Sequence, residues 1–173
     1  MIQRGSAAPA SRLPAGAVVP YKVHGRVCPC LAGRIEEPVA QENLSGHAEV
    51  RETSEIPIQA GENWWFPRGF AEAIAAGARD FIMPDLMKVG GITGWLNAAG
   101  QADAASIPMS SHILPEASAH VLAVTPTAHW LEVLDFAGAI VADPIKIVDG
   151  ALTARGPGLG LEWNESAIAK YLI

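Results

Sequence analysis

The sequence predicts an α/β fold, in which about five parallel strands alternate with helices as part of a (β/α) barrel. Short apolar runs end repeatedly in an ionisable residue, namely Glu36, Glu62, Asp85, His112 and Glu132. Successive members of this set are 26, 23, 27 and 20 residues apart. That spacing is about what a strand, a helix and two loops require, and parallel strands need such crossover connections.

The composition agrees with a buried parallel sheet. The chain has 173 residues, of which 50% are hydrophobic and 17% are charged. A chain of this length can bury a core, and strands covered on both faces are strongly apolar. The net charge of −6 disfavours a nucleic-acid partner, and no apolar run reaches the roughly 18 residues of a membrane helix. We therefore expect a soluble, cytoplasmic protein with neither a nucleic-acid nor a membrane partner.

The first 32 residues differ in character from the rest of the chain. They are rich in Ala, Pro, Gly and Arg, show neither helical nor strand periodicity, and contain no Asp or Glu. Because Glu36 is the first acid, residues 1–35 carry a charge of +5 and the remainder carries −11. We interpret residues 1–32 as an irregular segment, disordered or unrelated to the rest, and residues 33–173 as a partial barrel domain.

The first half of that domain predicts three strands and two helices. Pro38 stops a strand that begins at Arg34, and Asn43 is a good N-cap for the helix that follows. Pro67 suits a helix start, and Gly77 suits a helix end. We expect strands at 34–37, 56–60 and 81–83, and helices at 44–54 and 67–75.

The second half of the domain continues the alternation of strands and helices and then ends in a predicted hairpin. A glycine-rich turn at 90–94 precedes an expected helix at 95–105, and we expect it to pack closely at the rim of a pocket. It lacks the spacing of a nucleotide-binding loop. Strands are expected at 107–111 and 129–132, with a helix at 118–124 between them. Asp149-Gly150 then predicts a hairpin turn between 145–148 and 152–154.

The five ionisable residues suggest one shared site. A single acid at a strand end is equally well explained as a helix cap. The carboxyl ends of barrel strands meet at one mouth, however, so five ionisable residues at five successive strand ends favour a shared pocket. Glu36 and Glu62 are hard oxygen ligands suited to Mg²⁺. Asp85 and His112 suit a dyad in which the carboxylate orients the imidazole, and Glu132 suits a proton or hydrogen-bond donor. This set fits abstraction of a proton next to a carboxylate.

Six motifs carry a resemblance to a known family. They are Ile-Glu-Glu-Pro (35–38), Gly-Glu-Asn-Trp (61–64), Met-Pro-Asp (83–85), the segment 87–95, Pro-Met-Ser-Ser-His (108–112) and His-Trp-Leu-Glu (129–132). They resemble the C-terminal barrel domain of the mandelate racemase and muconate lactonizing enzyme family in the enolase superfamily, and mandelate racemase in particular. The resemblance runs from about Gly33 to the C-terminus and implies the C-terminal portion of a (β/α)7β barrel.

The resemblance implies a role for each site residue. Glu36 and Glu62 correspond to two of three Mg²⁺ ligands, and Asp85 and His112 to the base dyad on one face of the substrate. Glu132 corresponds to the acid that hydrogen-bonds the substrate carboxylate. The implied substrate is a small carboxylate, either a 2-hydroxy acid or a sugar acid. The implied reaction is racemisation, with dehydration of an acid sugar as the alternative.

The chain also departs from the family pattern. The family has a capping domain, a Lys-x-Lys pair and a third metal-binding carboxylate, and none of these is present in this sequence. We therefore expect a truncated member with weak Mg²⁺ binding, so that activity of this chain alone is open. A non-catalytic remnant is the other interpretation. The unpaired edges of an incomplete barrel predict a homo-oligomer or aggregation.

Overall fold

The computed structural model describes residues 18–23 and 33–172. Five parallel strands pair in chain order, β2-β3-β4-β5-β6. The predicted α/β fold with about five parallel strands is thereby confirmed. The strands are β2 (Ile35–Glu36), β3 (Ile58–Ala60), β4 (Phe81–Ile82), β5 (Met109–Ser111) and β6 (Ala128–Val133).

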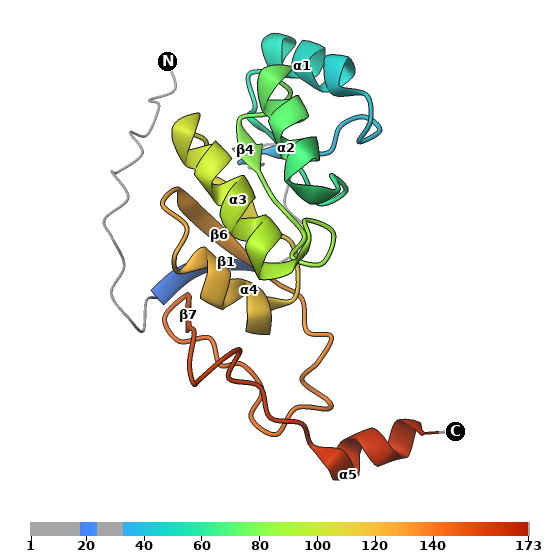
Figure 1. The fold of residues 1–173 in the computed structure, drawn as a ribbon, viewed down its shortest axis with the longest axis vertical. Coiled ribbons are helices and arrows are strands. Elements are labelled where there is room, and N and C mark those ends of the chain that lie inside the picture. Colours follow the sequence, from blue (N-terminus) through green and yellow to red (C-terminus); the bar gives the residue numbers. More distant parts are fainter. Residues whose placement is uncertain (1–17, 24–32, 173) are drawn as a thin grey trace.

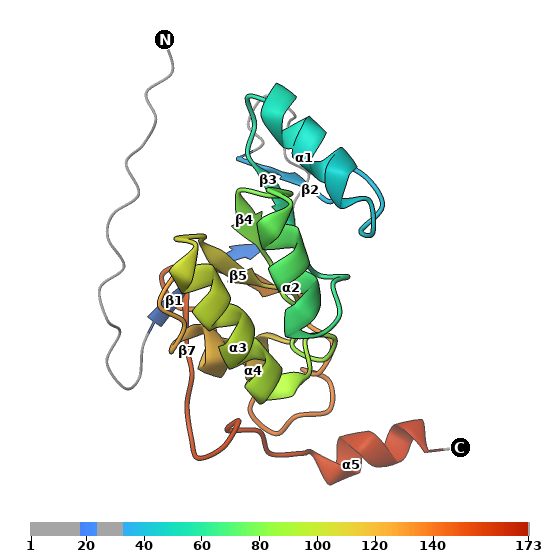
Figure 2. The same ribbon diagram turned by 45° about the horizontal axis from the view of Figure 1, so that its top comes forward.

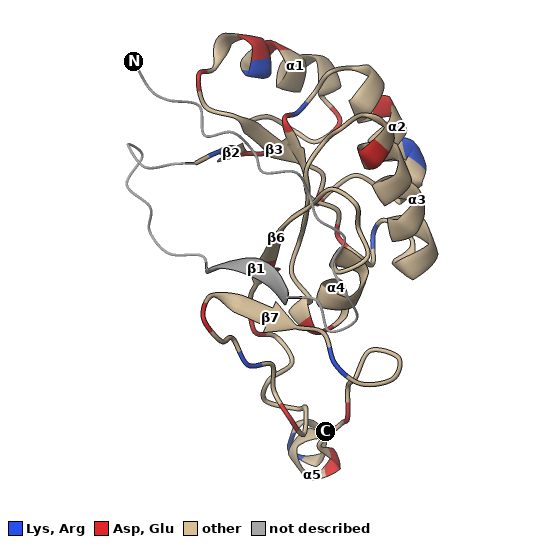
Figure 3. Cartoon of the chain, turned by 90° about the vertical axis from the view of Figure 1, so that its left-hand side faces the viewer, with Lys and Arg blue, Asp and Glu red and all other residues tan. Residues whose placement is uncertain are grey.

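One helix follows each of the first four of these strands. Figures 1 and 2 show the four helices in succession along one side of the sheet. Charged residues of both signs lie on α1 and α2 in Figure 3, whereas the strands carry few. The helices are α1 (Leu44–Thr53), α2 (Phe66–Ala75), α3 (Gly91–Ala104) and α4 (Pro115–Leu122).

Local sequence explains where these helices begin. Asn43 caps α1 by accepting a hydrogen bond from the Gly46 backbone N–H at 2.9 Å. A proline occupies the first turn of both α2 and α4, where its missing N–H costs nothing. Two helices start earlier than predicted, α3 at Gly91 instead of 95 and α4 at Pro115 instead of 118.

Two further strands extend the sheet beyond β6. β1 (Val18–Val23) pairs in parallel with β6 and antiparallel with β7 (Ala151–Thr153). β1 lies inside the segment in which the sequence shows no strand periodicity, and Pro20 within it weakens the strand signal. The rest of residues 1–32 lies outside the described residues, so the division of the chain at residue 32 stays a prediction.

The core lies between the helices and the strands. Its largest fully buried side chains include Trp95 on α3 and Phe70 on α2, both with no exposed surface. The Trp95 indole N–H donates to the Thr125 hydroxyl at 2.9 Å, which satisfies a buried donor. This core holds the strand ends in place, and the candidate site is built on those ends.

The C-terminal part is more open. Asp149 and Gly150 have φ values of 51° and 73°, which a type I′ turn requires, so the predicted turn is confirmed. Of its two expected arms, only β7 forms a strand. The short helices α5 (Glu165–Ile168) and η2 (Ala169–Tyr171) project from the body in Figures 1 and 2.

None of the helices among the described residues is both long enough and apolar enough to span a bilayer. In the sheet order of the described residues, β2 is a terminal strand and β3 is its only partner. The expectation that such an edge leads to association between copies stays a prediction.

Candidate functional site

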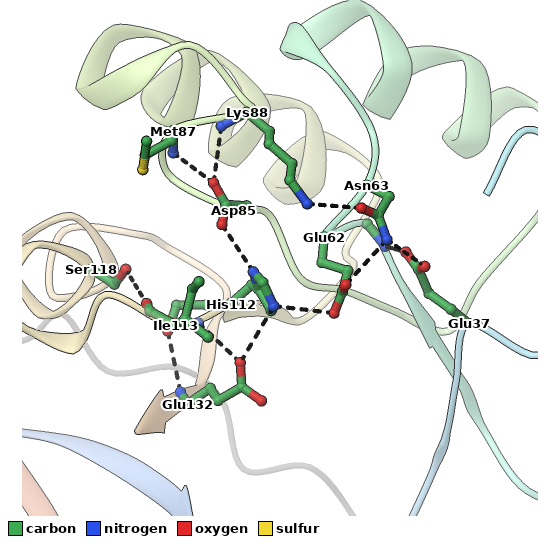
Figure 4. Close-up of polar contacts among 12 residues, drawn as sticks. Glu37, Glu62, Asn63, Asp85, Met87, Lys88, His112, Ile113, Ser118 and Glu132 are labelled. Atoms are coloured by element: carbon green, nitrogen blue, oxygen red, sulfur yellow. Dashed lines mark hydrogen bonds and ion pairs between the residues drawn. The ribbon is translucent and has the colours of Figure 1, made fainter. Parts of the chain in front are cut away.

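The structure brings four of the five candidate residues together at the carboxyl ends of the strands. Glu62 follows β3, Asp85 follows β4, and His112 follows β5, while Glu132 is the next-to-last residue of β6. Asp85 and His112 also form an isolated parallel bridge beyond the ends of their strands. Figure 4 shows the three carboxylate side chains converging on the imidazole of His112.

Asp85 fixes the imidazole ring of His112. Its Oδ2 lies 2.9 Å from His112 Nδ1, and the Asp85 side chain is only 4% exposed. The other oxygen, Oδ1, accepts hydrogen bonds from the backbone N–H groups of Met87 and Lys88 at 2.8 and 3.0 Å. A donor at Nδ1 leaves Nε2 as the ring nitrogen that can take up a proton.

Two further carboxylates face that nitrogen. Glu62 Oε2 lies 3.2 Å and Glu132 Oε2 lies 4.0 Å from His112 Nε2. Glu132 is held by a hydrogen bond from the Ile113 backbone N–H at 2.9 Å, and its side chain is 9% exposed. The His112 ring therefore has a carboxylate oxygen near each of its two nitrogens.

Glu36 lies apart from these contacts. It ends β2, and its Oε2 accepts a hydrogen bond from the Gln59 side-chain amide at 3.1 Å. Burial lowers the pKa of the nearby Arg34 guanidinium, and the carboxylates of Glu36 and Glu132 partly oppose this effect. Arg34 is thus a cation close to two site carboxylates that the sequence pattern did not identify.

Three more residues belong to the site. The Asn63 side chain donates to Glu62 and to Glu37, and it accepts from Lys88. These three residues, Glu37, Asn63 and Lys88, all lie in the motifs given above. Glu37 and Asn63 are each next to a candidate residue, and Lys88 lies three positions after Asp85. This proximity is the only sequence signal for them. Their contacts depend on side-chain geometry that spacing alone does not specify.

The donor chemistry of the site fits Mg²⁺. Glu36 and Glu62 sit on the adjacent strand ends of β2 and β3, and they provide carboxylate oxygens. Mg²⁺ often binds through one or two carboxylates while keeping several waters. Across residues 33–172, no group of three or more His, Cys, Asp or Glu side chains is arranged to hold a metal ion. The fit is therefore one of donor type, in which Glu36 and Glu62 would be the two protein ligands.

A comparison with known families identifies the class of protein. Residues 26–167 match the family described as enolase C-terminal domain-like. The chain belongs to this family, and the resemblance seen in the sequence motifs is confirmed.

Individual relatives agree with that assignment. One solved structure is an enolase from Bradyrhizobium, complexed with magnesium and mandelic acid. It is 85% identical with a TM-score of 0.79, over 80% of this chain and 38% of the relative. An L-talarate dehydratase from Polaromonas sp. JS666, complexed with Mg and L-glucarate, is 31% identical with a TM-score of 0.74, over 79% of this chain and 38% of the relative.

A curated relative is named for a reaction other than dehydration. The D-galactarolactone cycloisomerase of Agrobacterium fabrum is 30% identical, and the match covers 79% of this chain and 41% of the relative. The chain thus spans less than half the length of the relatives it matches.

Proposed function

We propose that this chain supplies the base and two Mg²⁺ ligands for abstraction of the proton α to a small carboxylate, in the racemisation of a 2-hydroxy acid. The observation that carries the proposal is the 2.9 Å contact between Asp85 and His112, which leaves Nε2 directed into the group of carboxylates. Support for a 2-hydroxy acid comes from the mandelic acid bound to the Bradyrhizobium relative, which is 85% identical.

Each residue has a distinct task in this proposal. His112 Nε2 removes the α-proton, and Asp85 holds the ring in position and stabilises the imidazolium. Glu132 acts as a carboxylic acid in this proposal, and its O–H donates a hydrogen bond to the substrate carboxylate as negative charge develops there. Glu36 and Glu62 would hold Mg²⁺, which when bound supplies a Lewis acid that polarises the substrate carboxylate.

These residues account for one face of the substrate. If the protonated His112 exchanges that proton with solvent and then reprotonates the same face, the α-carbon gains a solvent hydrogen without inversion. Inversion needs a second acid on the opposite face. Proton exchange is therefore the activity that the described residues explain by themselves, and racemisation is the proposal for the whole protein.

A second candidate is an acid-sugar dehydratase. It is favoured by the L-talarate dehydratase relative and begins with the same α-proton removal. The two reactions diverge afterwards, because dehydration expels the β-hydroxyl and yields a keto acid. The fates of mandelate and of a panel of sugar acids therefore separate the two candidates.

The test is exchange of the substrate α-proton in D₂O, followed by NMR with Mg²⁺ present. His112→Asn should lower the exchange rate by about 100-fold or more, because the base is lost. His120→Asn is the matched control, since His120 lies on α4 and contacts the Leu159 carbonyl oxygen instead of the site. A folded wild-type sample that exchanges no proton from any acid of the panel would contradict the proposal and support a non-catalytic remnant.

A further inference from the structure

Lys88 joins the two loops that carry the site. Its Nζ donates to Asn63 Oδ1 at 2.7 Å, in the loop after β3. Its backbone N–H donates to Asp85 Oδ1 at 3.0 Å, in the loop after β4. Its carbonyl oxygen also accepts from the Phe66 backbone N–H at 3.1 Å. One residue therefore contacts the neighbours of both Glu62 and His112, as Figure 4 shows.

The ammonium group of Lys88 decides which way the Asn63 amide points. An ammonium can only donate hydrogen bonds, so the atom it meets must be the amide oxygen. The amide nitrogen then faces Glu62 Oε1 at 3.1 Å and Glu37 Oε2 at 2.9 Å. If the amide turned over, its oxygen would face two carboxylates and its nitrogen would face a cation. Lys88 thus selects the one orientation in which Asn63 can bind Glu62.

Glu37 is held in a special backbone conformation to take part. Its φ is 40°, in the left-handed region that costs a non-glycine residue about 1 kcal/mol or more. In this conformation its carboxylate accepts from Asn63 and from the Gly61 backbone N–H at 3.4 Å. Backbone strain of this kind is often retained at functional sites, where surrounding contacts compensate for it.

The result is a fixed direction for the Glu62 carboxylate. Oε1 is tied to Asn63, while Oε2 faces His112 Nε2 at 3.2 Å. Glu62 is 24% exposed, so a carboxylate without such a tie would sample several rotamers. Lys88 also supplies the positive charge that offsets the two carboxylates on either side of the Asn63 amide.

We propose that Lys88 is a positioning residue, which acts through Asn63 to orient Glu62 and through its own backbone to orient Asp85. The proposal rests on the proposed function for the role of Glu62 as a Mg²⁺ ligand. The side-chain and backbone contacts of Lys88 can be tested separately. Replacing the side chain removes the contact with Asn63 and leaves the backbone contact with Asp85 in place.

The experiment compares Lys88→Met with Lys88→Arg and with Lys146→Met. Lys146 is the matched control, because it pairs with Asp143 at the surface and its side chain is 66% exposed. The first readout is the NMR signal of the Asn63 side-chain amide in ¹⁵N-labelled protein. The second is the Mg²⁺ dissociation constant from calorimetry.

In Lys88→Met the Asn63 amide signal should shift and broaden, and the Mg²⁺ dissociation constant should rise about 10-fold. Lys88→Arg should show a smaller change in the Asn63 signal and in the Mg²⁺ dissociation constant. Lys146→Met should change neither of these two readouts. An unchanged Asn63 signal in Lys88→Met would overturn the positioning role. If wild type neither binds Mg²⁺ nor exchanges α-protons, the proposed function fails, and the Asn63 signal still decides the role of Lys88.

Discussion

The strand-and-helix region up to β6 and the segment after it use apolar residues differently. In the described part of the chain, one continuous core cluster draws its members from residues 60–131, with Leu152 of β7 as the single addition. The later segment leaves several of its large apolar side chains exposed. Those at least 44% exposed are Leu134, Phe136, Val148, Trp163, Tyr171 and Leu172.

The difference follows from the order of elements. In the first region each strand from β2 to β5 is followed by a helix that covers it, so apolar side chains on the facing sides of these elements meet another layer. Among the described residues after β6, only the four-residue α5 and the three-residue η2 are helical, and such short helices cannot cover a sheet. Apolar composition therefore predicts burial only where the chain also repeats the βα unit.

Two tryptophans, one in each region, test the difference in burial most directly. Trp95→Ala should lower the free energy of unfolding by about 3–5 kcal/mol, because Trp95 is fully buried and its loss leaves a cavity. Trp163→Ala should change it by about 0.5 kcal/mol or less, since Trp163 is 50% exposed. Urea unfolding followed by circular dichroism measures both values.

Trp95→Phe provides a milder variant if the alanine variant does not fold. It keeps much of the packing and loses the indole hydrogen bond to Thr125. Equal destabilisation by the two alanine substitutions would show that the later segment shares the core after all.

The same contrast explains how far the sequence predicted the fold. Five strands were predicted because each apolar run ends in a breaker or an ionisable residue. The start of α3 was missed because glycine disfavours helices, although Gly91 and Gly94 lie within α3. Gly94 is required there by packing, since a Cβ would lie 1.9 Å from the Val89 carbonyl oxygen. Such a close approach leaves no periodic trace in the sequence.

The candidate site shows a similar division. Strand phase was sufficient to gather Glu62, Asp85, His112 and Glu132, because parallel strands bring their ends to one edge. The roles assigned to these residues stay a prediction. The positions of residues at strand ends did not identify Arg34, and they did not identify Asn63 as the link between Glu62 and Lys88. Those contacts depend on rotamers and on the positive φ of Glu37, which only the folded chain specifies.

A smaller effect concerns His129 inside the first region. Its ring stacks on Phe81 with centroids 4.9 Å apart. Burial, and to a lesser extent the charge of Arg34, lowers the pKa of His129 to about 4. Between pH 4 and its unfolded value of about 6.5, the unfolded chain binds more protons, so stability should fall as the pH is lowered through this window.

The expected loss between about pH 7.5 and pH 5 is about 1–2 kcal/mol, reduced from the full shift because the ring is partly exposed. Urea unfolding of wild type and His129→Gln at both pH values measures it. The variant should lose less stability than wild type on acidification. His47, whose pKa is also lowered by burial, accounts for part of the slope that remains. Equal losses in the two proteins would exclude His129 as the cause.

The smallest effect compares two N-caps made by the same residue type. Asn43 caps α1 through Gly46 at 2.9 Å, and Asn164 caps α5 through Ala167 at 3.0 Å. Each contact is worth about 1 kcal/mol to its helix. Asn43→Ala should lower the global free energy of unfolding by that amount, because α1 contacts β3 and unfolds together with the sheet.

Asn164→Ala should instead leave global stability unchanged and fray α5 alone, since α5 projects from the body. Amide hydrogen exchange separates the two cases, because only local fraying speeds exchange at 165–171 without altering the sheet. If Asn164→Ala lowered global stability as much as Asn43→Ala does, α5 would have to unfold with the core. The two regions would then form one cooperative unit, despite the exposure of the apolar side chains in the later segment.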